Sequence, residues 1–215
     1  MKAAGPDPTR LVQRANELRL ALATRPVEML VKNTGASFHP ARSSVAGHLS
    51  LQFWRQTVQV SLPGFIAIQA SDGQELPAFT QAMLMYHFYT ADGAPITGQW
   101  ISFSELPDGR FYNQAFQGYT GDELRRAILQ REDFERAAAR LEGEAQGSGS
   151  LSPGALAYRF QALPRMPLLV VYWEGDEDLP GSFQVLFDAS ASHYMPTDGC
   201  ALLGSTLCRM LIKAL

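Results

Sequence analysis

The chain has 215 residues, of which 46% are hydrophobic and 18% charged, and its net charge is −3 at pH 7. This slightly acidic charge provides no basic field that would favour nucleic acid or an anionic membrane. No apolar stretch approaches the roughly 20 residues that cross a bilayer, and the N-terminal segment lacks the apolar centre of a secretory signal. We therefore expect a soluble, cytoplasmic protein that binds neither nucleic acid nor a membrane.

The N-terminal half of the chain alternates between helical and strand patterns. Apolar residues recur at helical spacing from Leu11 to Leu22, which predicts a helix that begins after Thr9. Residues 34–44 are predicted to be loop, and residues 49–69 to be three short strands. Residues 78–93 are apolar on every side, which indicates a buried helix, with a buried strand as the alternative.

The C-terminal half begins with a stretch, residues 95–119, that is predicted to be strand and loop. The sequence TGDE at residues 120–123 matches a capping box and predicts one helix from there to about Leu141. Two strands follow, at residues 167–175 and 182–190, joined by the acidic connection EGDEDLPG. A C-terminal helix closes the chain. It holds Cys200 and Cys208, whose backbones should lie roughly 12 Å apart, too far for a disulfide.

These elements predict a single domain of the α+β class. We expect a largely antiparallel sheet on which an N-terminal helix, central helices and a C-terminal helix pack. The domain, residues 1–215, divides by composition into an N-terminal helix and loop (1–48), strands and two helices (49–142), a flexible Gly/Ser-rich loop (143–156), and a strand pair with the C-terminal helix (157–215).

The turn LFDASASHYMPTDG, residues 186–199, gathers serine, histidine and aspartate in one short segment. The members of a catalytic triad come from separate segments, and neighbours on an extended chain alternate faces, so we do not predict a triad here. We interpret Asp188 as the acceptor of an Asx-type turn that ends the strand. His193 and Tyr194 are not required by that structural account, and they remain functional candidates.

Two further features could bind a ligand. The acidic connection contains Glu174, Asp176, Glu177 and Asp178, which could bind a hard cation, but it lacks the EF-hand pattern and is interpreted as a solvated connection. His87 lies in an apolar segment and is predicted to be a satisfied core residue. Only if His87 and His193 met would a metal or tetrapyrrole ligand pair arise. We assign no metal ligands, and the cofactor is unknown.

Longer segments of the chain resemble a known family. They are YHFYTADGAPITGQWISFSELPDGRFY and, later, LPRMPLLVVYWEGDEDLPGSFQVLFDASASHYMPTD. They resemble a prokaryotic family described only as domain of unknown function 3786, over most of the chain from about residue 50. Some members of that family look fused to a cysteine-rich iron–sulfur module of corrinoid and carbon monoxide pathways. The resemblance implies an accessory role near anaerobic or cofactor metabolism, although this chain lacks the cysteine cluster.

The leading hypothesis is a binding or accessory domain without catalysis of its own, because the strong local signals have structural explanations. Its partner would be an unidentified small molecule or protein. The alternative is an enzyme or a metal- or cofactor-binding protein with a pocket around Glu105, Asp176, Asp188, His193 and Tyr194. A homo-oligomer is a third hypothesis, suggested by the apolar last helix. The full set of candidate pocket residues is Trp100, Glu105, Trp173, Asp176, Asp188, His193 and Tyr194.

Overall fold

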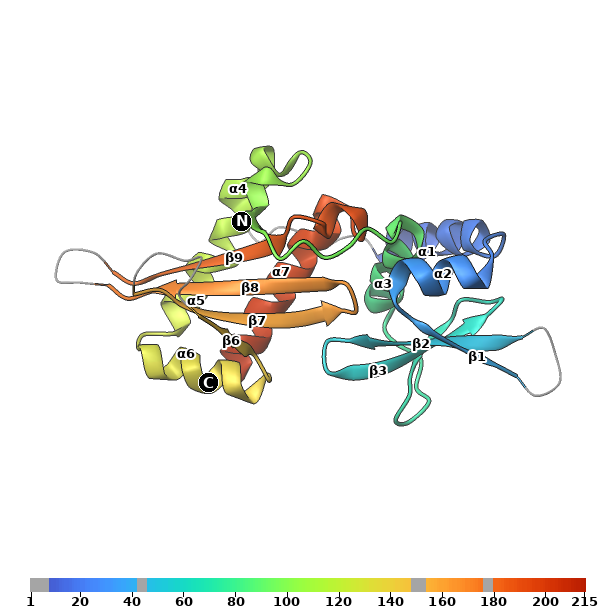
Figure 1. The fold of residues 1–215 in the computed structure, drawn as a ribbon, viewed down its shortest axis with the longest axis horizontal. Helices are drawn as coiled ribbons and strands as arrows, with labels where there is room; N and C mark the ends of the chain where they lie inside the picture. The colour runs from blue at the N-terminus through green and yellow to red at the C-terminus, as the bar shows by residue number, and fades with distance from the viewer. Residues whose placement is uncertain (1–7, 42–45, 148–153, 176–179) are drawn as a thin grey trace. The chain divides into compact units, whose positions relative to one another are not determined.

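A computed structural model describes residues 8–41, 46–147, 154–175 and 180–215 (Figure 1). The chain forms two compact units. The first comprises the described residues up to Pro95, together with Leu163–Arg165 and His193–Pro196. The second comprises the described residues of Ile96–Ala162, Met166–Ser192 and Thr197–Leu215. Both units are therefore assembled from segments that are not contiguous in the sequence.

The first unit combines helices with an antiparallel sheet of order β1-β2-β3-β4, here called the first sheet. Alternation of polar and apolar residues gives this sheet one buried face, on which Leu49 pairs with Val60 and Leu51 with Val58. Its helices are α1 (Pro8–Leu22), α2 (Val27–Thr34) and α3 (Ala78–Thr90), and its strands are β1 (Ser37–Pro40), β2 (Gly47–Phe53), β3 (Gln56–Leu62) and β4 (Ala67–Gln69).

A buried glutamine joins α3 to the edge of the first sheet. The Gln81 side chain accepts a hydrogen bond from the Ala67 N–H and donates one to the Ala67 carbonyl. Arg19 of α1 donates to the same amide oxygen at 2.7 Å and to the Phe65 carbonyl. Because buried polar groups are costly unless they are hydrogen-bonded, this arrangement fixes how α1, α3 and β4 pack.

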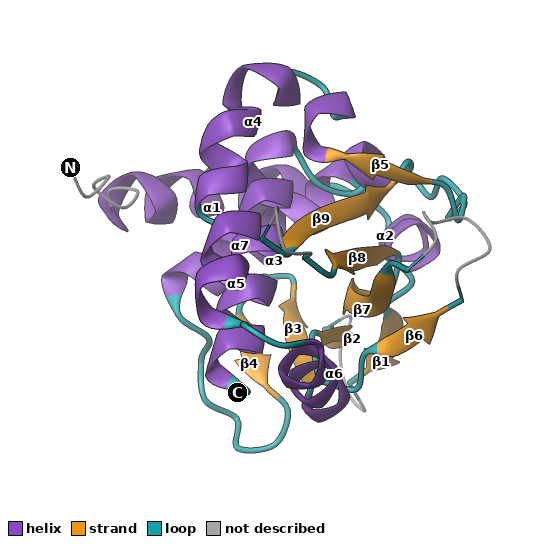
Figure 2. Ribbon diagram, turned by 90° about the vertical axis from the view of Figure 1, so that its left-hand side faces the viewer, coloured by secondary structure: helices purple, strands orange, loops and turns teal. Residues whose placement is uncertain are grey.

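The second unit is built on an antiparallel sheet of order β5-β9-β8-β7-β6, the second sheet. Helices α4, α5 and α7 lie on one side of it (Figure 2). Its strands are β5 (Trp100–Ser102), β6 (Glu144–Gln146), β7 (Leu156–Leu163), β8 (Met166–Trp173) and β9 (Ser182–Asp188). Its helices are η1 (Phe103–Glu105), α4 (Gly109–Gly118), α5 (Gly121–Ala127), α6 (Arg131–Arg140) and α7 (Thr197–Lys213), and the short turn η3 (Ala191–His193) leads from it into the first unit.

Aromatic side chains fill the space between these helices and the second sheet. The rings of Phe103 and Phe116 stack with centroids 4.2 Å apart, and both approach Phe187 of β9. Helix α7 comes close to the same cluster at Gly204, where a Cβ atom would lie 2.9 Å from the Phe116 ring. Glycine at this position lets the C-terminal helix pack directly against the aromatic core.

The two antiparallel sheets with their helices confirm the predicted α+β class. The helix near residues 9–26, the buried helix at 78–90, the strands between 49 and 69 and the C-terminal helix are also confirmed. Cys200 and Cys208 are both buried and free, as expected from their spacing in one helix. The single-domain organisation of residues 1–215 stays a prediction.

Several local predictions are wrong. Residues 37–40 form strand β1 within the predicted loop, and β7 was missed before the predicted strand pair. Residues 109–118 form helix α4, and the long helix predicted after residue 120 is two helices, α5 and α6. The predicted capping box is absent as well, because the Thr120 hydroxyl donates to the Phe116 carbonyl instead of capping α5.

Candidate functional site

Asp188, the last residue of β9, is buried and fully engaged in hydrogen bonds. Its Oδ1 atom accepts from the N–H and hydroxyl of Ser190, as the predicted Asx-type turn requires, and from the N–H and hydroxyl of Thr97. Its Oδ2 atom accepts from the Gly98 N–H at 2.7 Å. Burial by itself raises the pKa of this carboxyl group, but the hydrogen bonds outweigh burial and hold the pKa below its ordinary value. Asp188 is thus an ionised structural anchor.

Glu105 has a comparable structural role in η1. Its carboxylate accepts the N–H and the hydroxyl of Ser102, at 2.7 and 2.8 Å, and closes a capping box. These two hydrogen bonds lower the pKa of Glu105. The sequence therefore contains a genuine capping box, but it lies before α4, whereas the predicted one lies after α4.

The two candidate tryptophans lie on the same small cluster of the second sheet. Trp100 pairs in register with Asp188, whereas Trp173 pairs with Ser182 at the opposite end of β9. Both indole side chains pack on a cluster of buried residues and share that role with Leu186. The cluster consists of Ala157, Leu169 and Val171. The tryptophans therefore supply packing volume on this face of the sheet.

The antiparallel course of β9 separates two parts of the predicted pocket. The level of Trp173, at Ser182, and that of Asp188 are six residue steps apart along β9, which corresponds to roughly 20 Å of strand. Glu174 and the acidic connection follow Trp173, so they begin at the end of the strand pair that lies away from Asp188. Asp176 itself lies outside the described residues.

His193 and Tyr194 belong to the first unit, and both are engaged with the segment that follows α3. His193 Nδ1 lies 2.7 Å from Asp92 Oδ2, in a contact that is about half exposed. The hydrogen bond from His193 is the largest cause of the lowered pKa of Asp92. The buried Tyr194 donates its hydroxyl to the Ala94 carbonyl. Both residues therefore hold the chain between α3 and Ile96.

Beneath this segment lies His87, which is completely buried. Its Nδ1 atom lies 3.3 Å from the Tyr194 carbonyl, and its Nε2 atom has no hydrogen-bond partner among the described residues. Burial lowers the pKa of His87 to about 4, although the carbonyls of Tyr194 and Thr34 oppose the shift. His87 is therefore neutral at pH 7, as a buried core histidine.

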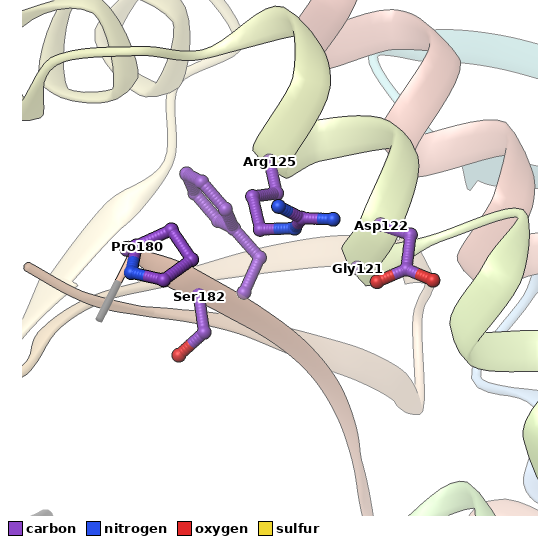
Figure 3. A pocket seen from close by; sticks show the side chains of 7 residues that line it. Gly121, Asp122, Arg125, Pro180 and Ser182 are labelled. Carbon is purple, nitrogen blue, oxygen red and sulfur yellow. The ribbon is translucent and has the colours of Figure 1, made fainter. Parts of the chain in front are cut away.

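A groove on the second unit was not anticipated from the sequence. Two adjoining hollows, of about 350 and 510 Å³, share Arg125, Pro180 and Gly181 as walls. We call them together the Arg125 groove. Figure 3 shows the smaller hollow, with Arg125 and Asp122 on the side of α5 and with Pro180 and Ser182 on the side of the sheet. The larger hollow continues along the segment that joins α5 to α6.

Arg125 stands out among the arginines of α5 and α6 because its guanidinium makes no ion pair with any residue that the structure describes. Its neighbours are paired within their own helices. Arg126 contacts Glu123 at 2.8 Å, and Arg131 contacts Glu135 at 3.0 Å. An exposed guanidinium that lines both hollows can donate hydrogen bonds to an anionic group of a ligand.

The larger hollow adds apolar surface and carboxylates to this cation. Leu129, between α5 and α6, is 78% exposed and lines the hollow together with Tyr172, Glu132 and Glu174. Burial, followed by the charges of Glu174 and Glu132, raises the pKa of the Tyr172 hydroxyl. The groove thus offers two arginines, of which Arg131 is paired with Glu135, together with an apolar contact and two carboxylates within one continuous surface.

Sequence reasoning missed this groove because its residues lie in a segment interpreted as one solvated helix. The exposed Leu129 interrupts the charged face there, and this is the one signal that could have drawn attention to it. Among the residues that the structure describes, three or more His, Cys, Asp or Glu side chains never gather in a way that could hold a metal ion. No helix in the described ranges has both the length and the apolar character needed to span a membrane.

Comparison with known proteins gives one match. No curated protein and no solved structure matches the chain. The family model described as "Domain of unknown function (DUF3786)" matches residues 27–210. The match begins in α2 and ends within α7, and it includes both segments that carry the resemblance. Since it covers most of the 215 residues, the chain belongs to the DUF3786 family.

Proposed function

We propose that this chain is a binding domain without catalysis of its own and that the Arg125 groove is its ligand site. The observation that carries the proposal is Arg125, a cation that has no partner among the described residues and lines both hollows of the groove. A charge in such a position is available to a ligand without the loss of an ion pair to any residue that the structure describes.

The ligand class follows from the charges that surround Arg125. A carboxylate bound to the guanidinium would leave the apolar part of a ligand near Leu129 and Tyr172. A cationic group would be attracted to Glu132 and Glu174 farther along the groove. This order of charges fits a short peptide-like molecule that carries a carboxylate, an apolar side chain and an ammonium group.

A non-catalytic role is supported by the way the predicted acid and base residues are used. Asp188 accepts five hydrogen bonds and Glu105 closes a capping box. A general acid or base must be able to reach a substrate proton, and these groups are already engaged. The enzymatic alternative, with its pocket around these residues, has no observation in its favour, and we do not adopt it.

An accessory role near cofactor or anaerobic metabolism belongs to the same proposal and rests on what the family resemblance implies. The partner would be a small molecule or a protein segment of the chemistry given above. The cytoplasmic location and the homo-oligomer stay predictions from the sequence.

The proposal can be tested by NMR with the tripeptide lysyl-alanyl-leucine as the probe. We expect this peptide to shift the backbone amide resonances of Arg125, Leu129 and Gly181. Amidation of its C-terminus should weaken binding by about tenfold, because a charge-assisted hydrogen bond is lost. Acetylation of its amino groups should weaken binding as well, through the loss of attraction to Glu132 and Glu174.

The matched variants are Arg125→Gln and Arg126→Gln. The two arginines are adjacent on α5, but Arg126 does not line the groove and is paired with Glu123. We expect Arg125→Gln to abolish the response to the C-terminal carboxylate and Arg126→Gln to preserve it. Equal responses from the two variants, or a free and an amidated peptide that bind alike, would refute the proposed site.

A further inference from the structure

Two histidines lie side by side on neighbouring strands of the first sheet. Antiparallel pairing of β1 and β2 places His39 directly opposite His48. Their imidazole rings stack with centroids 4.9 Å apart and an angle of 14° between the ring planes. Their neighbours Phe38 and Leu49 point to the other face, where Leu49 is buried in the core. Since side chains alternate along a strand, both imidazoles lie on the face of the sheet away from that core.

The backbone allows strands β1 and β2 to approach each other closely beside this histidine pair. Gly47 lies beside His48, and a Cβ atom at this glycine would be only 2.6 Å from the His39 carbonyl oxygen. Glycine therefore permits the near approach of β1 to β2 at the level of the two imidazoles. Pairing of His48 with Ser61 of β3 continues the row across the sheet. The histidines are thus placed by a hydrogen-bonded ladder rather than by a loop.

We propose that His39 and His48 form a binding site for a divalent transition-metal ion. Neutral imidazole is a preferred ligand of Ni²⁺, Cu²⁺ and Zn²⁺, whereas Mg²⁺ and Ca²⁺ prefer oxygen ligands. Because the lone pair of an imidazole nitrogen lies in the plane of the ring, the two nearly parallel rings must rotate about their Cβ–Cγ bonds before one nitrogen of each can bind a shared ion. His39 is exposed to solvent, so water completes the coordination. The site is independent of the Arg125 groove, which belongs to the other unit.

A structural pair is the competing explanation. Stacked aromatic rings on neighbouring strands stabilise a sheet without any metal. The two explanations differ in one measurable property, the affinity for an added metal ion. Only a metal site loses this affinity when either histidine is replaced.

The test is calorimetric titration of the full chain, without an affinity tag, with NiCl₂ in a buffer that does not chelate metals. We expect one Ni²⁺ per chain and no heat of binding with MgCl₂. His39→Gln and His48→Gln should each weaken Ni²⁺ binding at least about tenfold, and the double variant should show little further loss.

His193→Gln is the matched control, since it removes a half-exposed histidine from elsewhere in the first unit. It should bind Ni²⁺ as the unaltered chain does. Circular dichroism of each variant without metal separates loss of the site from loss of the fold. Unchanged Ni²⁺ affinity in the folded double variant would overturn the proposal. So would a stoichiometry of one ion per two chains, because the ion would then bridge two molecules.

Discussion

Asp188 and Thr97 are joined by two hydrogen bonds, although they lie 91 positions apart in the sequence. Both the N–H and the hydroxyl of Thr97 donate to Asp188 Oδ1 at 3.0 Å. The carboxylate therefore ties the segment before β5 to the end of β9. This contact gives a structural role to the aspartate that appeared, from the sequence, to belong to a cluster of catalytic residue types.

Asp188→Asn should destabilise the second unit by about 2 kcal/mol. An asparagine can keep one oxygen acceptor, but its NH₂ group would then face the Gly98 N–H. Both groups are hydrogen-bond donors, so this hydrogen bond would be lost. The free energy of unfolding in urea measures the loss. Asp108→Asn is the control, because Asp108 is exposed and adopts a positive φ of 58° that asparagine tolerates well. A loss for Asp188→Asn no larger than for the control would contradict the structural role.

The same carboxylate makes the stability of the fold depend on pH, and the lowered pKa gives the direction of this dependence. Its pKa in the folded protein is lower than its ordinary value, so its charge stabilises the fold above the unfolded-state pKa of about 4. This stabilisation is lost as the pH falls through the lower folded-state pKa. The difference in stability between the unaltered chain and Asp188→Asn should accordingly be constant near neutrality and shrink in strong acid.

His87 should make the protein sensitive to milder acid. Its pKa is lowered to about 4 by burial, whereas a histidine in the unfolded chain titrates near 6.5. The unfolded state therefore binds a proton first, and stability is lost as the pH falls from about 6.5 to about 4, by roughly 3 kcal/mol. His87→Leu removes this titration. Equilibrium unfolding of both proteins at several pH values isolates the effect, and parallel curves across this range would contradict it.

Two glycines near the Arg125 groove should respond in opposite ways to alanine. At Gly121 a Cβ atom would lie 2.4 Å from the Phe183 carbonyl oxygen, so α5 must move away from β9. We expect Gly121→Ala to cost about 1–3 kcal/mol. At Gly118 a Cβ atom would meet nothing within 4 Å, and Gly118→Ala should be neutral or stabilising by up to about 1 kcal/mol. Thermal unfolding compares the two, and an equal effect at both positions would contradict the close approach.

The predicted single domain can be tested with the tryptophans that report on each unit. Trp54 belongs to the first unit, whereas Trp100 and Trp173 belong to the second. Trp54→Phe leaves fluorescence from the second unit only, and the double variant Trp100→Phe, Trp173→Phe leaves fluorescence from the first. We expect both reporters, as well as circular dichroism, to give the same urea midpoint within each variant. Separate midpoints in one protein would mean two domains.

Elements with a regular burial pattern could be predicted from the sequence, and irregular ones could not. Alternation on β2 and β3 and the uniformly apolar α3 were sufficient to predict those elements. Helix α4 was missed because Phe111 and Tyr112 are 83% and 60% exposed, which breaks the apolar periodicity. Its start also lacks a signal, since the Asp108 side chain makes no capping hydrogen bond. Strand β1 is exposed along its whole length and ends in Pro40, so no alternation marks it.

The candidate site was harder to predict than the fold, because it depends on which strand ends lie at the same edge of the sheet. The Asx-type turn at Asp188 is a local feature and was predicted correctly. The expected meeting of the acidic connection with that turn stays a prediction, because Asp176 lies outside the described residues. Strand direction does not favour it, since β9 begins after the connection and ends at Asp188. Arg125 gives no signal in one sequence, where it looks like every other arginine on a charged helix. Its lack of an ion-pair partner among the described residues can be seen only in the folded chain.

The first unit is built from segments that are far apart in the sequence, and this affects how the protein folds during its synthesis. His87 receives its hydrogen-bonding partner from Tyr194, which leaves the ribosome 107 residues later. Arg165, which donates to the carbonyls of Gly93 and Lys32, also arrives late. A nascent chain that ends near Pro95 would therefore bury His87 without the Tyr194 carbonyl that contacts its Nδ1 atom. The first unit should therefore fold only after its C-terminal segments have been synthesised. A nascent chain on a ribosome stalled after Pro95 should be readily cleaved by proteases.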